Sequence, residues 1–446
     1  MSLDEMVNRY IITGAQLGAR PHKGFEKAMQ AYAEHLGAQI IVAPMNGSYK
    51  EEQLHPAIAE NGNYIIANEY NFNSNFELAD VPVRSQQIRP TTGLSRFVQH
   101  SKSAVIAAPK QHLECRPTSS IDLPKILTTT GAMTVPNYKL HTRIGNIANR
   151  DHTIGALVVE TDGDMFQYRH ITADTKGTFH DIDVRVDAEG NITDSRPDAL
   201  VLGDWHTGST DPMVRDVTYE MLEKLQPKNL IIHDLFDGYS ISHHEQNQLM
   251  NRARKADEGK LNLYAELQVV GEELQNFYEL LADDAKMVVV KSNHDEVIDR
   301  YLQEGRFAQD PENFYLSCKL GMAKIEGKDP LQVGIEEVHG DFGKYIKWLS
   351  RDDDYKVRGW QLGAHGDLGG NGSRGSLTQQ QDNYGKSIVG HRHTPSIRGD
   401  AWCVGTSTTL KVDYNRGPSS WMQTHALLHP NGKPQLINVI DGRYRF

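Results

Sequence analysis

The spacing of hydrophobic positions changes several times along the chain, and each change predicts a new element. RYIITGAQ at residues 9–16 is an apolar run typical of a strand. GFEKAMQAYAEHLG at 24–37 places its apolar residues at helical spacing, and AQIIVAPM at 38–45 is rich in branched residues, as strands are. The chain is therefore predicted to open as an α/β unit.

Further strand-like runs follow this opening, separated by stretches rich in Pro, Thr and Asn. They are NYIIAN at 63–68, SAVIAAP at 103–109, IGALVVET at 154–161 and FHDIDVRV at 179–186. The segment DAEGNITDSRPDA at 187–199 is polar and rich in turn formers, which is typical of a boundary. We therefore expect an α/β N-terminal domain at 1–195, serving substrate binding or oligomerisation, and a catalytic domain at 196–446.

The second half repeats one arrangement, in which an apolar strand ends in acids and imidazoles. A strand at 199–202 precedes Asp204 and His206, and NLIIHDLFD at 229–237 contains Asp234 and Asp237. A helix is predicted at 214–226 and a long helical stretch at 243–284. The remaining blocks of this kind are KMVVVKSNHD with Asn293 and His294, LGAHGD with His365, and SIVGHRHTP with His391 and His393.

These strand ends are expected to meet, because the carboxyl ends of parallel strands line one crevice at the edge of a sheet. Four imidazoles, two carboxylates and one amide oxygen among them are the candidate metal donors: His206, His365, His391, His393, Asp204, Asp234 and Asn293. Mixed nitrogen and oxygen donors suit two adjacent divalent ions, with a carboxylate between ions about 3.5–4 Å apart. We expect manganese, with iron, zinc, nickel and magnesium as alternatives. Each histidine taken alone is more often structural, so the prediction rests on the whole set.

The order D-x-H, D-x-x-D, N-H-D, H and G-H-x-H resembles the calcineurin-like metallophosphoesterase family over roughly residues 198–440. The resemblance implies a β-sandwich flanked by helices. It also implies that Asp234 bridges two metals, one held by Asp204, His206 and His393 and the other by Asn293, His365 and His391. His294 matches the family's histidine that protonates the leaving oxygen, and Asp295 is a candidate for orienting it. One departure is His233, where the family usually has glycine, and this residue is expected to reshape the pocket or contact the substrate.

Three local features favour a nuclease in which two metals activate a water molecule. DLFD resembles the form of this motif in the nuclease branch that includes the double-strand-break repair nucleases, and phage-encoded nucleases of the family offer a parallel. The glycine-rich HGDLGGNGSRGS at 365–376 would let Arg374 pair with a phosphate, and Tyr384 and Lys386 would contact a neighbouring phosphate or base. In the alternative interpretation these are ordinary solvated positions. The function is then that of a phosphomonoesterase or small-nucleotide phosphodiesterase, or of a non-catalytic metal-binding scaffold.

Composition sets limits on this picture. The chain of 446 residues has a formal net charge of −11, which argues against a protein whose whole surface holds nucleic acid but leaves room for a local DNA site. Its three cysteines form no CxxC pair, so a disulfide framework or zinc–thiolate site is not expected. MSLDEMVNRY lacks the features of a signal peptide, and no apolar run of about 18 residues occurs. We expect a cytoplasmic protein, in the host cytoplasm if phage-encoded, with DNA as its substrate and no membrane partner; a homo-oligomer is left open.

Overall fold

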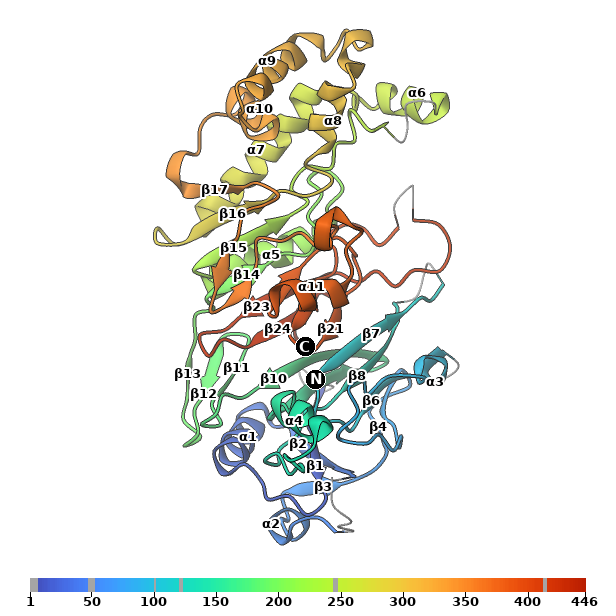
Figure 1. Cartoon of the computed structure of the whole chain (residues 1–446), viewed down its shortest axis with the longest axis vertical. Coiled ribbons are helices and arrows are strands. Elements are labelled where there is room, and N and C mark those ends of the chain that lie inside the picture. Colours follow the sequence, from blue (N-terminus) through green and yellow to red (C-terminus); the bar gives the residue numbers. More distant parts are fainter. Residues whose placement is uncertain (1–6, 47–52, 100–101, 120–122, 244–247, 412–414) are drawn as a thin grey trace, which may run out of the picture.

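The structure is a computed structural model that describes residues 7–46, 53–99, 102–119, 123–243, 248–411 and 415–446. It is a mixed α/β protein, as expected, with three large sheets and one small sheet in the described part of the chain (Figure 1). Figure 1 shows helices α7 to α10 at one end of the molecule and the N-terminal segment at the other. The C-terminal strands lie between these two ends.

The first sheet confirms the predicted strand–helix–strand opening. Its order is β10-β9-β1-β2-β3, in which β1, β2 and β3 run parallel and β9 pairs antiparallel with both β1 and β10. The strands are β1 (Val7–Gln16), β2 (Gln39–Met45), β3 (Tyr64–Ile66), β9 (Gly155–Asp162) and β10 (Met165–Thr172). Helix α1 (Lys23–Leu36) follows His22, whose ring accepts a hydrogen bond from the Phe25 N–H, and it ends at Gly37 with φ +64°.

The second sheet carries the strand ends on which the metal prediction depends. Its order is β17-β16-β15-β14-β23-β24, with β14 to β17 parallel and β23 and β24 antiparallel. The strands are β14 (Ala199–Val201), β15 (Asn229–His233), β16 (Lys286–Val290), β17 (Ile346–Leu349), β23 (Thr424–Leu428) and β24 (Pro434–Asn438). The helices that follow them are α5 (Pro212–Leu225), α6 (Leu249–Asp257), α7 (Leu263–Leu280), α8 (Val297–Gln303), α9 (Phe314–Ile325) and α10 (Pro330–Val338).

Two predicted elements are wrong in detail. The long helical stretch at 243–284 contains two helices, because Gly259 takes φ +69° after α6 and the Asn262 side chain caps the N-terminus of α7. The run at 179–186 is a hairpin rather than one strand, since the chain reverses at Ile182 with φ +51°. Its strands β11 (Phe179–Asp181) and β12 (Val184–Val186) form a small sheet with β13 (Ile192–Asp194).

The third sheet contains strands from both halves of the chain, in the order β18-β19-β20-β22-β21-β7-β8-β6-β5-β4. The N-terminal members are β4 (Tyr70–Asn71), β5 (Phe76–Leu78), β6 (Ser103–Ile106), β7 (His112–Arg116) and β8 (Lys125–Thr129). The C-terminal members are β18 (Lys356–Val357), β19 (Trp360–Gln361), β20 (Ser387–Val389), β21 (Ser396–Arg398) and β22 (Ala401–Cys403). The two sets join where β7 pairs with β21, Leu113 opposite Ile397. The division at residue 195 stays a prediction about domains, but this sheet runs across it.

The remaining helices are α2 (Pro56–Ala59), α3 (Ser95–Gln99), α4 (Arg143–Arg150) and α11 (Leu377–Tyr384). Short 3₁₀ turns occur at Arg306–Gln309, Gly343–Tyr345 and Gly370–Gly372. In the described part of the chain, every helix is too short or too polar to cross a lipid bilayer.

The second sheet is buried on both faces, and alternate residues of its strands belong to different cores. Leu200 and Leu202 pack in one core with α5 and α7, whereas Ala199 and Val201 pack in another with residues of the ten-stranded sheet such as Trp402. This follows from the period of two along a strand. Because both faces are covered, the carboxyl edge of β14 to β16 is where polar side chains can gather.

Candidate metal centre

The loops after three parallel strands begin at the same level of the sheet. Leu200 pairs with Leu230, and Leu230 pairs with Met287, so β14, β15 and β16 are in register. The loops that follow carry Asp204 and His206, Asp234, and Asn293. His365, His391 and His393 reach the same place from the loops around β20, in the ten-stranded sheet.

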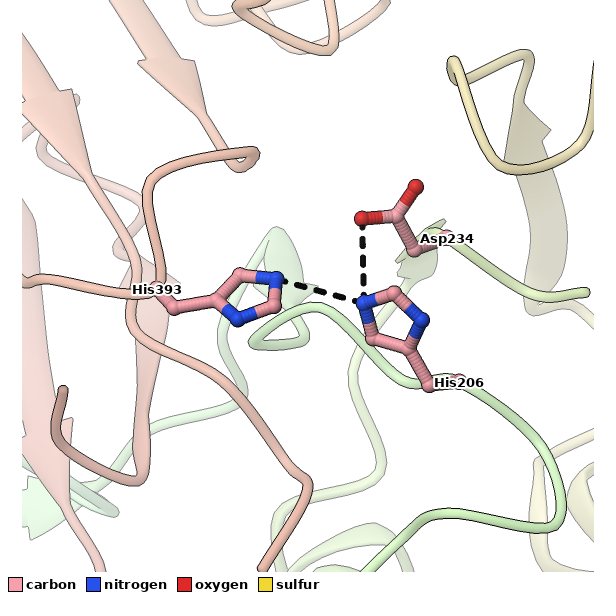
Figure 2. A group of neighbouring side chains, drawn as sticks. All are labelled: His206, Asp234 and His393. Atoms are coloured by element: carbon pink, nitrogen blue, oxygen red, sulfur yellow. Dashed lines mark hydrogen bonds and ion pairs between the residues drawn. The ribbon is translucent and has the colours of Figure 1, made fainter. Parts of the chain in front are cut away.

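One group of donors surrounds the Nε2 atom of His206. This atom lies 3.3 Å from Asp234 Oδ2 and 3.2 Å from His393 Nε2. Figure 2 shows that the Asp234 and His393 side chains both point towards it. His393 Nε2 also lies 3.1 Å from Asp204 Oδ2. Two imidazole nitrogens at this separation need a proton or a cation between them, because two lone pairs repel each other.

A second group lies on the other side of Asp234. His365 Nε2 is 3.4 Å from Asp234 Oδ1 and 3.1 Å from Asn293 Oδ1, and His391 Nδ1 is 3.0 Å from the same Asn293 oxygen. Asp234 therefore turns one carboxylate oxygen to each group. Two buried sets have the spacing of metal ligands, His206–Asp234–His393 and Asp204–Asp234–His365, and Asp234 belongs to both. Asp204 also lies 3.1 Å from His393 and so borders both groups, and a third, less buried set is His206–Asp237–His294.

The buried atoms of this cluster lack the partners that a metal-free role would require. Asp204 is fully buried, and neither of its carboxylate oxygens accepts a hydrogen bond from the described residues. Asp234 Oδ1 is also without a hydrogen bond among them, as are the Nδ1 atoms of His365 and His393. An unpaired buried polar group costs about 1–3 kcal/mol, and more when it is charged. The donor set therefore fits a cation, although it does not identify which one or how many.

The backbone is strained at the same residues. His206, Asp234, His391 and His393 have φ angles of +50°, +47°, +73° and +54°, in the left-handed region that side chains disfavour. In the described part of the chain only five other non-glycine residues share this conformation. Strain of about 1–3 kcal/mol at each such residue persists where the surrounding structure requires it, as at binding sites.

The charges of the cluster are strongly coupled. Burial and the neighbouring Asp234 raise the pKa of Asp204 well above its ordinary value. Burial also raises the pKa of Asp234, but His365 and His206 outweigh it and hold that pKa well below the ordinary range. The pKa of His393 falls to about 3 because of burial and the nearby His206. Burial lowers the pKa of His206, but Asp234 and Asp237 outweigh it and raise that pKa well above its ordinary value. Metal binding requires the neutral form of each imidazole ligand, so a cation at this site would displace the proton from His206.

Gly390 is required by the close packing behind these ligands. A Cβ at this residue would lie 2.1 Å from Asp204 Oδ1 and 3.3 Å from His233 Cβ. The glycine of the G-H-x-H block thus leaves space for a carboxylate from the opposite sheet.

Asp237 links two of the histidines. A hydrogen bond of 2.9 Å joins His206 Nδ1 and Asp237 Oδ1, which leaves His206 Nε2 to face the metal donors. His294 Nδ1 donates to the Asp237 carbonyl oxygen over 3.1 Å, and its ring meets that of His206 edge to face at 4.5 Å. His294 is partly exposed, unlike the buried His206 and His393.

Asp295 and His233 lie behind the cluster. Asp295 is fully buried, and its two carboxylate oxygens accept hydrogen bonds from the Phe236 and Ser292 N–H groups over 3.0 Å each. Asp295 therefore ties two loops together, whereas the hydrogen bond that positions His294 comes from Asp237. His233 is fully buried, its ring centre lies 5.5 Å from that of His365, and burial lowers its pKa to about 4.

The three proposed substrate-binding residues outside the cluster differ in placement. Arg374 is exposed in the glycine-rich loop, and Tyr384 is exposed at the end of α11. Lys386 precedes β20 and lies over the Trp360 ring, at the opposite end of that strand from His391. The structure brings together the seven predicted ligands and His294, but Lys386 does not lie with them.

Two neighbours of the cluster were not among the predicted site residues. Asp237 belongs to the D-x-x-D block, whose spacing was the available signal for it. Trp421 places its ring 4.2 Å from that of His393, and no motif marks it.

Comparison with known proteins gives one informative result. No protein-family model matches the chain. The chain is similar to Protein A1 of Escherichia phage T5. The two are 29% identical over 464 residues, an alignment that covers 98% of this chain and 82% of Protein A1. The similarity therefore extends over both halves of the chain, including the N-terminal half in which no catalytic motif was found.

Proposed function

We propose that this protein is a phage-encoded, metal-dependent phosphodiester hydrolase that cleaves DNA, with the metal centre of a calcineurin-like metallophosphoesterase. The observation that carries the proposal is the placement of Asp234. It contributes to two buried sets of metal donors, one on each of its carboxylate oxygens. A shared carboxylate of this kind suits a pair of divalent cations.

The residues that would hold the cations are Asp204, His206 and His393 in one set and Asn293, His365 and His391 in the other, with Asp234 between them. Bound divalent cations would offset the charge of a phosphate and lower the pKa of a water molecule. Manganese is our first candidate, because the donors are imidazole nitrogens and carboxylate or amide oxygens without thiolates. Asp237 fixes the ring of His206, and the Asp204 and Asp234 carboxylates supply the negative charge.

His294 is the proposed proton donor. It is adjacent to the cluster through its ring contact with His206, yet its side chain is 28% exposed and it belongs to neither of the two buried donor sets that share Asp234. The Asp237 carbonyl accepts from its Nδ1, which leaves Nε2 to carry the proton that a departing alkoxide needs. Removing such a donor typically costs about 10²–10⁴ in rate.

DNA is the proposed substrate for two reasons. The chain is similar along its length to a phage protein, and the DLFD block resembles the nuclease branch of the family. Arg374 is exposed in a loop that begins at the ligand His365, and its proposed role is to pair with a phosphate next to the cleaved one. A phage-encoded nuclease would act in the cytoplasm of the host.

The deciding experiment uses protein freed of metal with EDTA and then supplied with Mn, Mg or Zn. Linear duplex, circular duplex and single-stranded DNA are offered beside bis-p-nitrophenyl phosphate and p-nitrophenyl phosphate. The proposal expects cleavage of DNA and of the diester, dependent on added metal and lost in the Asp234→Asn variant. Rapid hydrolysis of the monoester with every DNA form left intact would instead support the phosphomonoesterase.

A further inference from the structure

Positive charge is concentrated in one segment of an otherwise acidic chain. Residues 81–150 contain ten Lys or Arg and two Asp or Glu, although the whole chain has a formal net charge of −11. This segment includes β6, β7, β8 and α4, and therefore lies in the half without catalytic residues. Acidic proteins that bind polyanions must concentrate their basic residues in this way.

Several of these basic residues are exposed and have no acidic partner. Arg84, Arg89, Arg96 and Arg143 are all exposed, and the described residues provide no ion pair to any of them. By contrast, Arg116 pairs with Glu114, and Arg150 pairs with Asp151. Unpaired exposed guanidinium groups are the ones free to meet an anion from outside.

The loops that carry these arginines lie beside one another. Burial raises the pKa of Tyr138, and the buried Ser85, which follows Arg84, is one of the neighbours that oppose this rise. Tyr138 begins the loop that leads to Arg143. Thr91, two residues after Arg89, donates a hydrogen bond of 2.7 Å to Glu114 of β7.

Strand β7 leads from these loops to the metal centre. Just beyond its end, Thr118 and Ser419 exchange two backbone hydrogen bonds of 2.9 and 3.0 Å. Ser419 is two residues from Trp421, whose ring packs against His393. Within β7 itself, the Cys115 thiol donates to the carbonyl of Pro395, two residues after His393. The loop with Arg84 and Arg89 therefore contacts β7 at Glu114, and the segments next to His393 contact the same strand at Cys115 and just beyond it at Thr118.

We propose that Arg84, Arg89 and Arg143 form a basic path that binds the phosphates of duplex DNA to one side of the metal centre. This inference rests on the proposed function and names the part of the N-terminal half that serves it. The four residue steps from Glu114 to Thr118 span about 13 Å, which is the length of about four base pairs of duplex DNA. The path thus holds phosphates that a small phosphodiester does not possess.

The test measures DNA binding without cleavage. A fluorescently labelled duplex of about 30 base pairs is titrated in EDTA with the native protein and with the triple variant Arg84→Gln, Arg89→Gln and Arg143→Gln. Each lost phosphate contact should reduce the slope of log affinity against log salt by about 0.9, so three contacts give about 2.7. The affinity should fall at least about tenfold near 0.15 M salt.

The matched control replaces three exposed lysines elsewhere, Lys260, Lys286 and Lys356, by glutamine. It changes the net charge by the same amount, and the salt slope should stay that of the native protein. Metal content and the thermal unfolding midpoint of both variants show whether the fold is intact.

The outcomes separate the path from the proposed function. If native protein binds and cleaves DNA but the arginine variant keeps the native salt slope, the path is wrong and the nuclease stands. The opposite result is that native protein binds but does not cleave DNA, and that the arginine variant has a reduced salt slope. The basic path is then supported and the proposed hydrolysis of DNA is wrong. Absence of both binding and cleavage overturns both.

Discussion

Replacing Gly390 by alanine adds one methyl group at the back of the metal centre. Its Cβ would lie 2.1 Å from Asp204 Oδ1, 3.1 Å from Asp204 Cγ and 3.3 Å from His233 Cβ. Gly390 does not have a positive φ, so its backbone accepts alanine without strain. The substitution therefore acts through the Asp204 carboxylate.

The size of the effect follows from these distances. An ordinary contact between carbon and oxygen is about 3.3 Å, so Asp204 Oδ1 must move by about 1.2 Å. Metal–ligand distances are held to within about 0.2 Å, and Asp204 would no longer reach a cation in its native position. We expect metal affinity to fall at least about 100-fold and the rate of diester hydrolysis to fall by about 10² or more.

The assay is calorimetric titration of Mn into EDTA-treated Gly390→Ala protein, alongside hydrolysis of bis-p-nitrophenyl phosphate. In EDTA the unfolding midpoint should stay near the native value, because the nearest atoms that the added Cβ meets belong to side chains and not to the backbone. The control is Gly321→Ala on α9, where a Cβ meets open space and alanine favours the helix by up to about 1 kcal/mol. Native metal affinity and turnover in Gly390→Ala would refute the assignment of Asp204 as a ligand.

Three further predictions test the site and the fold. Asp234→Asn should lose both metal occupancy and hydrolysis, since it removes the carboxylate common to both donor sets; metal analysis showing native content would contradict this role. His294→Ala should keep native metal content while turnover falls about 10²–10⁴-fold, and loss of metal together with rate would instead make His294 a ligand. His170→Gln should flatten the dependence of stability on acid pH, as chemical denaturation at pH 7.5 and pH 4 would show.

The sign of the His170 effect follows from its surroundings. His170 is buried between β10 and β8, with Nε2 3.0 Å from Thr128 Oγ1, and burial lowers its pKa to about 4. The unfolded value is about 6.5, so the folded state favours the neutral ring. Its contribution is fully present above pH 6.5 and is lost as pH falls towards 4, which amounts to about 3 kcal/mol. The native protein should lose that much more stability than His170→Gln over this range, and parallel profiles would refute the argument.

Local patterns in the sequence determined the elements around the site. The apolar runs at β14, β15 and β16 predicted strands whose ends carry the metal donors, because strand residues buried on both faces must all be apolar. The helical spacing of apolar residues at 24–37 also predicted α1 correctly, because that spacing is a property of residues close together in the sequence. Asn262 and Gly259 mark the break between α6 and α7, but the prediction of one helix ignored these local signals.

Only the tertiary structure decided which donors meet and in what roles. His206 and His393 are 187 residues apart, and their contact depends on the packing of two sheets rather than on either segment. The same packing gave Asp237 its contact with His206 and assigned Asp295 to the backbone of two loops. It also joined β7 of the N-terminal half to β21, which follows the ligands His391 and His393 in the chain. The hydrophobic period of a segment shows which of its faces is buried. Which other element covers that face depends on shape and strand register across the whole fold.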